Sequence, residues 1–106
     1  MFTLYFHDKA ETELNALPVS MIAKVVKLLS KLEANPLLLR EPNTKPLGSG
    51  LFEFRTEGCD IARGLWIYQA GKRIFVLRIF IKKTPKTPPG ETELALRRLK
   101  EMLNEI

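Results

Sequence analysis

The chain has 106 residues, 45% of them hydrophobic and 27% charged, and for this length we expect one domain built around a single core. The sequence has no run of about 18 apolar residues, so no membrane span is predicted, and its first residues lack the pattern of a secretory signal. Seventeen Lys and Arg against twelve Asp and Glu give a formal net charge of +5, which favours an anionic partner such as nucleic acid.

Cysteine and histidine are scarce. Cys59 is the only cysteine, which excludes an internal disulfide and indicates a reducing compartment, so we expect the protein in the cytoplasm. No group of His, Cys, Asp and Glu has metal-ligand spacing, and no phosphate-cradling glycine motif occurs, so we expect no metal and no other cofactor.

The first half of the chain predicts a strand followed by two helices. Residues 2–6 are rich in β-formers, and Asp8 is expected to cap a short helix over 9–17. A longer helix follows Pro18 and ends at Asn35-Pro36. Its expected apolar face is Ile22, Val25, Val26, Leu29 and Leu32, with Lys24, Lys27 and Lys31 on another face. The segment 36–50 holds three prolines and two glycines and is interpreted as a long surface connection.

The second half predicts an antiparallel meander and a last helix. The strands are 51–56, 61–68 and 73–83, separated by tight turns, and the helix covers about 91–105. Its apolar stripe is expected at Ala95, Leu99, Met102, Leu103 and Ile106, opposite Arg97, Arg98, Lys100 and Glu101. The order β-α-α-β-β-β-α indicates an α+β fold in which helices pack on a small antiparallel sheet.

Alternation along the strands separates two expected faces. Phe75, Leu77, Ile79 and Ile81 should form the face buried against the helices. The other face would carry Arg55, Arg78 and Lys82 together with the apolar residues Leu51, Val76 and Phe80. Such a mixture suits an RNA groove or a partner's contact surface, although a solvated outer face is the simpler reading.

Motifs in the second half resemble the RelE/ParE toxin superfamily, in its phage-derived HigB-like branch. The strand LFEFR (51–55) is similar to that family's signature, Arg63 stands on the next strand, and FIKKTPKTP (80–88) precedes a helix that begins with Glu91 and Glu93. The resemblance covers residues 45–105 well and the first helices in pattern only. The sequence departs from the family at Ala62, where many relatives have tyrosine. Some relatives have histidines in the active site, whereas His7 is the only histidine of this sequence.

The resemblance implies a metal-independent endoribonuclease, which cleaves messenger RNA on the ribosome by attack of a ribose 2′-hydroxyl on phosphorus. Arginine binds phosphate well but is a poor acid or base, whereas lysine transfers protons if its pKa falls. We therefore expect Arg55 and Arg63 on the scissile phosphate and Lys82 or Lys83 in proton transfer or phosphate binding. Phe80 is expected to stack on a base, and Glu53 to act as a base or to orient Arg55. Arg78 and Lys86 complete the predicted RNA-binding set.

The resemblance also implies partners and alternatives. A toxin of this type would be held inactive by a cognate antitoxin, expected to be a HigA-like helix-turn-helix protein, and would act on mRNA in the 70S ribosome. Two other hypotheses remain open. One is a ParE-like protein that blocks DNA gyrase without catalysis. The other is an RNA-binding module that has lost catalysis, for which Ala62 and the missing histidines are the best support.

Overall fold

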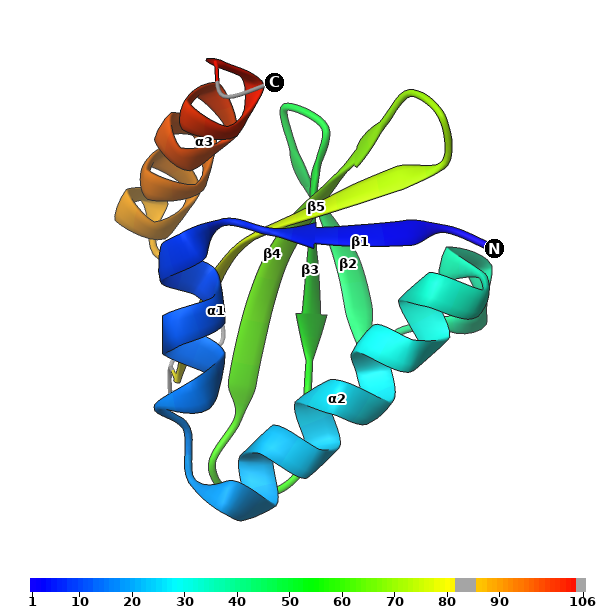
Figure 1. The fold of residues 1–106 in the computed structure, drawn as a ribbon. Coiled ribbons are helices and arrows are strands. Elements are labelled where there is room, and N and C mark those ends of the chain that lie inside the picture. Colours follow the sequence, from blue (N-terminus) through cyan, green and yellow to red (C-terminus); the bar gives the residue numbers. More distant parts are fainter. Residues whose placement is uncertain (82–85, 105–106) are drawn as a thin grey trace.

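A five-stranded mixed sheet forms the centre of the computed structural model, which describes residues 1–81 and 86–104. The strand order is β1-β5-β4-β3-β2, and β1 runs parallel to β5 while the other pairs are antiparallel. The strands are β1 (Thr3–Phe6), β2 (Thr44–Gly48), β3 (Leu51–Arg55), β4 (Ala62–Gln69) and β5 (Arg73–Ile81) (Figure 1).

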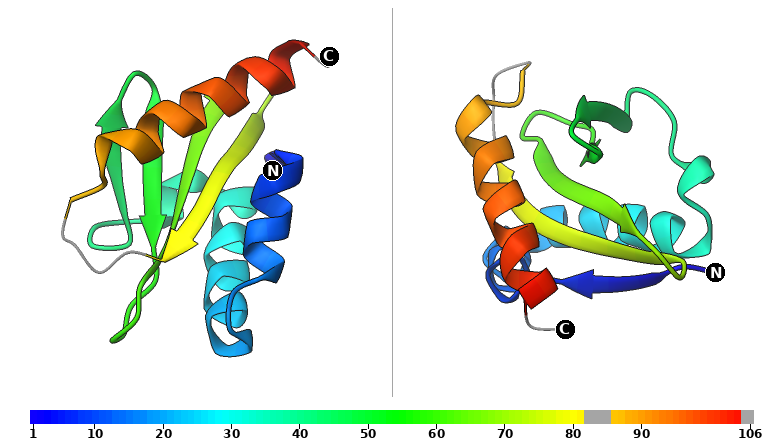
Figure 2. Two further views of the ribbon diagram at one scale, coloured as in Figure 1. Left: turned by 90° about the vertical axis from the view of Figure 1, so that its left-hand side faces the viewer. Right: turned by 90° about the horizontal axis from the view of Figure 1, so that it is seen from above.

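Helices cover both faces of this sheet. The helices are α1 (Asp8–Asn15), α2 (Val19–Ala34) and α3 (Pro89–Asn104), with a short 3-10 helix, η1, at Pro36–Leu38. The two views of Figure 2 show α2 on one side of the sheet and α3 on the other. No helix within residues 1–81 and 86–104 is long and apolar enough to cross a membrane.

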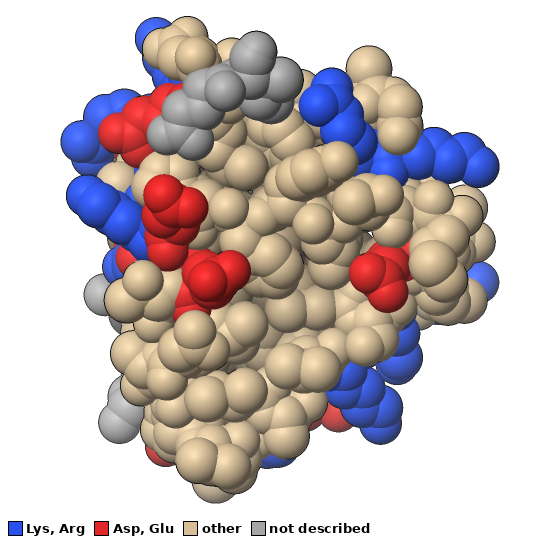
Figure 3. All heavy atoms as spheres, in the orientation of Figure 1, with Lys and Arg blue, Asp and Glu red and all other residues tan. Residues whose placement is uncertain are grey.

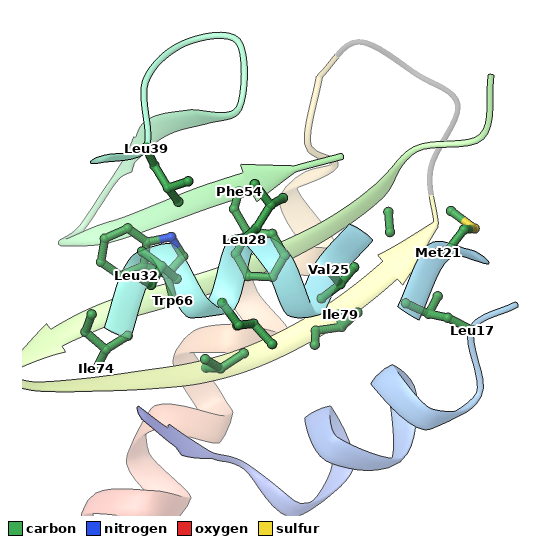
Figure 4. Packing of buried hydrophobic residues seen from close by; sticks show 13 residues of the cluster. Leu17, Met21, Val25, Leu28, Leu32, Leu39, Phe54, Trp66, Ile74 and Ile79 are labelled. Atoms are coloured by element: carbon green, nitrogen blue, oxygen red, sulfur yellow. The ribbon is translucent and has the colours of Figure 1, made fainter. Parts of the chain in front are cut away.

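The larger core lies between α2 and the sheet. Met21, Val25, Leu28, Leu29 and Leu32 are its buried residues from α2. They pack against side chains from three strands: Phe54, Ala62, Trp66, Ile74, Val76 and Ile79 (Figure 4). The buried face of α2 is therefore rotated from the predicted one, since Val26 is exposed and Leu28 is buried.

A second core lies between α3 and the opposite face of the sheet. It contains the buried residues Leu51, Leu65, Phe75, Leu77, Phe80 and Ala95. The two faces change over within β5, because Leu65 pairs with Arg78 but Trp66 pairs with Val76, so that Leu77 is an extra residue in a β-bulge. The bulge corrects the predicted faces: Phe75 and Leu77 lie with Phe80 under α3, while Val76 and Ile79 face α2.

The α+β class and the predicted order of elements are confirmed, with two differences in the sheet. The segment 36–50 contains the edge strand β2, which was missed because Pro46 and Gly48 are depleted from strands, although an edge tolerates them. The sheet is mixed rather than purely antiparallel, because β1 lies parallel to β5 at the other edge.

Helix ends and faces differ from the predictions in three places. His7, not Asp8, caps α1, since its Nδ1 accepts a hydrogen bond from the Lys9 amide at 3.1 Å. Arg98 is buried, although it was expected on the solvent face of α3, and Leu103 is largely exposed. Ile106, the last residue of the predicted stripe, lies outside the described residues.

Candidate functional site

Three predicted site residues meet on the face of the sheet that α3 covers. Arg55 at the end of β3 pairs with Arg63 of β4, and Glu53 lies two residues before Arg55 on the same face. Antiparallel pairing therefore brings two guanidinium groups and one carboxylate together at one end of the sheet.

The Glu53 carboxylate is the centre of this cluster and is completely buried. Its Oε1 accepts hydrogen bonds from Arg55 Nε at 3.1 Å and Arg55 Nη2 at 2.8 Å. Its Oε2 accepts a hydrogen bond from the hydroxyl of Thr87 and lies 4.0 Å from Arg63 Nη1. Glu53 thus fixes the orientation of Arg55 and also anchors the segment before α3 to β3.

The two arginines differ in exposure. The Arg55 side chain is 22% exposed, whereas that of Arg63 is only 2% exposed. Burial lowers the pKa of Arg63; the charge of Glu53 opposes this shift and the charge of Arg55 adds to it. Of this pair, Arg55 is the guanidinium that solvent can reach.

A depression of about 220 Å³ lies beside Arg55. Arg55 and Lys45 provide two cations in its lining, and Glu41, Pro42 and Thr44 complete it. Lys45 stands opposite Glu53 in the register of β2 and β3, which places the lysine on the same face. Two cations outnumber the single Glu41 carboxylate among these lining residues, which suits the binding of one phosphate group.

Arg78 belongs to a separate ion-pair network that joins three elements. Its Nε and Nη2 donate to Glu91 of α3 at 2.9 and 3.2 Å, and its Nη1 donates to Glu13 of α1 at 2.5 Å. Glu13 also accepts hydrogen bonds from Arg98 at 2.8 and 2.9 Å and from the Ile79 amide at 3.1 Å.

This network shifts the pKa values of its members. Burial acts to raise the pKa of Glu13, but the Arg98 and Ile79 hydrogen bonds and the charges of Arg78 and Arg98 outweigh it, so the pKa is lowered. Burial acts in the opposite sense on Arg78, and its bonds and charge pairs with Glu91 and Glu13 raise its pKa overall. Both groups are thereby held in their charged forms.

Comparison with known proteins identifies the family. A family model described as phage-derived protein Gp49-like matches residues 12–100. The chain belongs to the Gp49-like family. The Gp49-like family is a RelE-like toxin family, so the predicted resemblance to RelE-type toxins is confirmed, while the HigB-like branch stays a prediction. No curated protein matches the chain.

Solved structures agree with this assignment. A chain of the toxin–antitoxin complex RelBE2 from Mycobacterium tuberculosis is 27% identical, with a TM-score of 0.59 over 76% of this chain and 98% of that one. A mutant of the Escherichia coli toxin RelE in the free state has a TM-score of 0.67 at 17% identity, over 92% and 96%. The archaeal RelE–RelB complex from Pyrococcus horikoshii has a chain with a TM-score of 0.53 at 17% identity, over 74% and 91%. The last two show likeness of fold alone.

The predicted site residues of this Gp49-like chain are only partly brought together. Glu53, Arg55 and Arg63 form one cluster, and the Thr87 hydrogen bond brings the segment that holds the exposed Lys86 near it. Arg78 is engaged by Glu13 and Glu91 instead, and Phe80 is buried in the second core with the Arg78 Cζ 5.3 Å from its ring centroid. Lys82 and Lys83 lie outside the described residues.

The structure also adds residues that the sequence analysis missed. Lys45 lay within the segment interpreted as a connection, and only its pairing with β3 brings it to Arg55. Thr87 belongs to the recognised TPKTP motif but carried no signal for a bond to Glu53. His7 is a structural residue: its Nε2 contacts Glu101 of α3 at 2.7 Å, while its Nδ1 caps α1.

Charge is unevenly spread over the surface. Figure 3 shows the face formed by α1, α2 and β1 as mostly uncharged, with a few Asp and Glu side chains within it and Lys and Arg side chains mainly at its margins. Within residues 1–81 and 86–104 no group of three or more His, Cys, Asp and Glu could hold a metal ion.

Proposed function

We propose that this Gp49-like chain is the toxin of a two-component toxin–antitoxin system and an endoribonuclease that cleaves messenger RNA in the ribosome. The observation that carries the proposal is the arrangement around Arg55: a partly exposed guanidinium, oriented by a completely buried carboxylate, beside a hollow that Lys45 also lines. A pre-oriented cation of this kind stabilises negative charge as it develops on a phosphate.

The proposed reaction needs no bound cofactor. The ribose 2′-oxygen attacks phosphorus and loses its proton, the bond to the 5′-oxygen breaks, and that oxygen takes up a proton, which leaves a cyclic phosphate and a 5′-hydroxyl end. Arg55, with Lys45, would stabilise the pentacoordinate phosphate. Glu53 is completely buried and accepts hydrogen bonds from Arg55 and Thr87, so we assign it the orienting role rather than that of the base.

Proton transfer is assigned to Lys82 or Lys83, on the family resemblance alone. Lysine acts as a base only if its pKa is lowered, which a neighbouring cation would do. Arg63 is buried against Glu53, so its proposed role is to support the charge at the site from beneath the surface.

An antitoxin is the proposed partner of the chain. Two of the similar solved structures are toxin–antitoxin complexes, which supports a cognate antitoxin here. The apolar surface that the sequence seemed to offer such a partner is occupied, however, because Leu51 and Phe80 lie under α3 and Val76 under α2. We propose that the antitoxin inhibits the chain by covering the Arg55 hollow, for which an acidic segment would be complementary in charge.

Translation of a defined message in a reconstituted bacterial system tests the proposed activity. The wild-type chain should produce new 5′ ends in the message, mapped by primer extension, and Arg55→Ala should cut about 10²–10³-fold more slowly. Arg97→Ala removes an exposed arginine of α3 and serves as the matched control, with wild-type cutting expected. An intact message with the wild-type chain would refute the proposal, and inhibition of gyrase supercoiling under the same conditions would support the ParE-like alternative.

A further inference from the structure

A second cationic feature lies on the α2 side of the molecule, away from the Glu53 cluster. It is a groove of about 440 Å³ between α2 and the chain that leaves β3. Lys24, Lys27 and Lys31 line it from the helix, and Asn43, Thr56 and Glu57 are among the residues that line it from the opposite side. We call these three lysines the lysine row.

The lysine row has little internal compensation. None of the positions three or four residues from these lysines within α2 is acidic, and Lys24–Lys27 and Lys27–Lys31 are like-charge pairs at those spacings. Like-charge pairs at these spacings destabilise a helix. Within residues 1–81 and 86–104 these lysines make no ion pair, and Lys24 donates instead to the Glu57 backbone carbonyl at 3.1 Å. Among the described residues of the lining, Glu57 supplies the only carboxylate. An anion from outside would therefore relieve the repulsion.

The geometry of the row fits a strand of nucleic acid. Lys24 and Lys31 are seven residues apart, so the row extends roughly 10 Å along the helix. A strand in helical form advances about 3.4 Å per phosphate, so about three phosphates could follow the row.

The groove and the proposed cleavage site are separate hollows that flank the same end of β3. Thr56 directly follows Arg55 in the chain, and the two side chains open on different hollows, Arg55 beside Lys45 and Thr56 opposite the lysine row. An RNA strand bound at Arg55 would need only to pass around the end of β3 to reach the lysines.

We infer that the lysine row is a second binding surface for the phosphate backbone of RNA, which holds the single-stranded substrate while Arg55 engages the scissile phosphate. This inference rests on the proposed function for the identity of the polyanion. The row would contribute affinity and salt dependence but no chemistry, because it lies on the other side of the sheet from the Glu53 cluster.

Binding of a fluorescein-labelled single-stranded RNA of 20 nucleotides, measured by anisotropy over a range of salt concentrations, tests the inference. Changing Lys24, Lys27 and Lys31 together to Gln should reduce the slope of log K against log salt by about 2, since each phosphate contact on a single strand contributes about 0.7. The matched control changes the exposed Lys9, Lys72 and Lys100 to Gln, which removes the same charge elsewhere and should leave the slope within about 0.5 of wild type. Changing the row to Arg should preserve the wild-type slope.

Message cleavage in the reconstituted system separates this inference from the proposed function. If both hold, Arg55→Ala keeps most of its RNA affinity and loses cutting, whereas the Lys→Gln row variant loses affinity and cuts only when its concentration is raised. A row variant with the wild-type slope overturns the inference. A wild-type chain that binds RNA through the row but never cuts overturns the proposed function and leaves the inference standing.

Discussion

At some positions of this protein the residue type is determined by close tertiary contacts, which the alternation of apolar and polar residues along a strand does not reveal. Gly64 lies in the middle of β4, opposite Phe54 of β3, and the Phe54 ring lies directly over it. A Cβ at residue 64 would overlap that ring, and Phe54 is completely buried, so the ring has no free direction in which to move. Packing therefore requires glycine at position 64, because the Phe54 ring lies too close to the Gly64 backbone to leave room for a side chain.

Gly64→Ala should therefore be strongly destabilising. We expect the free energy of unfolding to fall by about 2–3 kcal/mol, the cost of overpacking a filled core. Urea denaturation followed by circular dichroism measures it. Gly90→Ala, at a position of α3 where an added Cβ meets no other atom, is the control and should change stability by less than about 1 kcal/mol. Equal midpoints for the two variants would show that the Phe54 ring can move aside.

Among the elements, α1, β5 and α3 are joined by charges rather than by apolar contacts alone. Glu13 of α1 accepts hydrogen bonds from the side chains of Arg78 in β5 and Arg98 in α3, and from the backbone amide of Ile79. Ile79 lies beyond the part of β5 that pairs with β1. The Glu13 carboxylate therefore accepts the hydrogen bond from the Ile79 amide that a longer β1 would otherwise accept. The network orients α3 over the second core.

Glu13→Gln should weaken this junction and change the response of stability to pH. Removing the charge leaves two arginines without their common partner, at a cost of about 3 kcal/mol near neutral pH. The pKa of Glu13 is lowered on folding, so its contribution is complete above the unfolded value of about 4.5 and is lost as the pH falls through the lower folded value. Urea midpoints between pH 3 and 7 should thus fall less steeply toward acid for the variant than for wild type.

The exposed Glu93 of α3 provides the control for this experiment. Glu93→Gln removes a similar charge from the surface and should leave both the midpoint at pH 7 and its pH dependence close to those of wild type. A pH profile for Glu13→Gln that matches wild type would mean that the network contributes nothing to acid sensitivity.

The whole molecule depends on a sheet that is covered on both faces. The larger core under α2 and the second core under α3 share the strands β3, β4 and β5, and the β-bulge at Leu77 distributes β5 side chains between them. Leu51, Leu65, Leu77 and Phe80 are shielded on the α3 side. A molecule of this size has little stability to spare if one of two cores is opened.

Truncating the chain after Pro88 should expose the second core. Without α3 the apolar side chains beneath it would face water, and Arg78 and Glu13 would lose Glu91 and Arg98 respectively. We expect the truncated chain to bind the dye ANS strongly, to self-associate in analytical ultracentrifugation and to unfold without a cooperative transition. A truncated chain that stays monomeric, binds no dye and unfolds cooperatively would contradict this role for α3.

The amino-acid sequence alone determined the class of the fold, the three strands of the meander, the long helices and the family. These features are encoded by periodicity over many neighbouring residues and by a motif that is continuous in the chain, LFEFR with FIKKTPKTP. Arg55 and Arg63 were expected at one site only from the family resemblance, and the register of β3 and β4 is what brings them opposite one another.

Tertiary structure alone decided which residues of each strand face which helix, and what the charged residues do. The extra residue Leu77 reverses the alternation of side chains along β5. Val76 therefore faces α2 rather than the face predicted to bind RNA. No local sequence pattern indicates this bulge. The partners of Glu13 lie 65 and 85 residues away, and Lys45 reaches Arg55 only through pairing of an edge strand that contains proline. Contacts between distant segments depend on how whole elements pack, and short-range patterns carry no record of them.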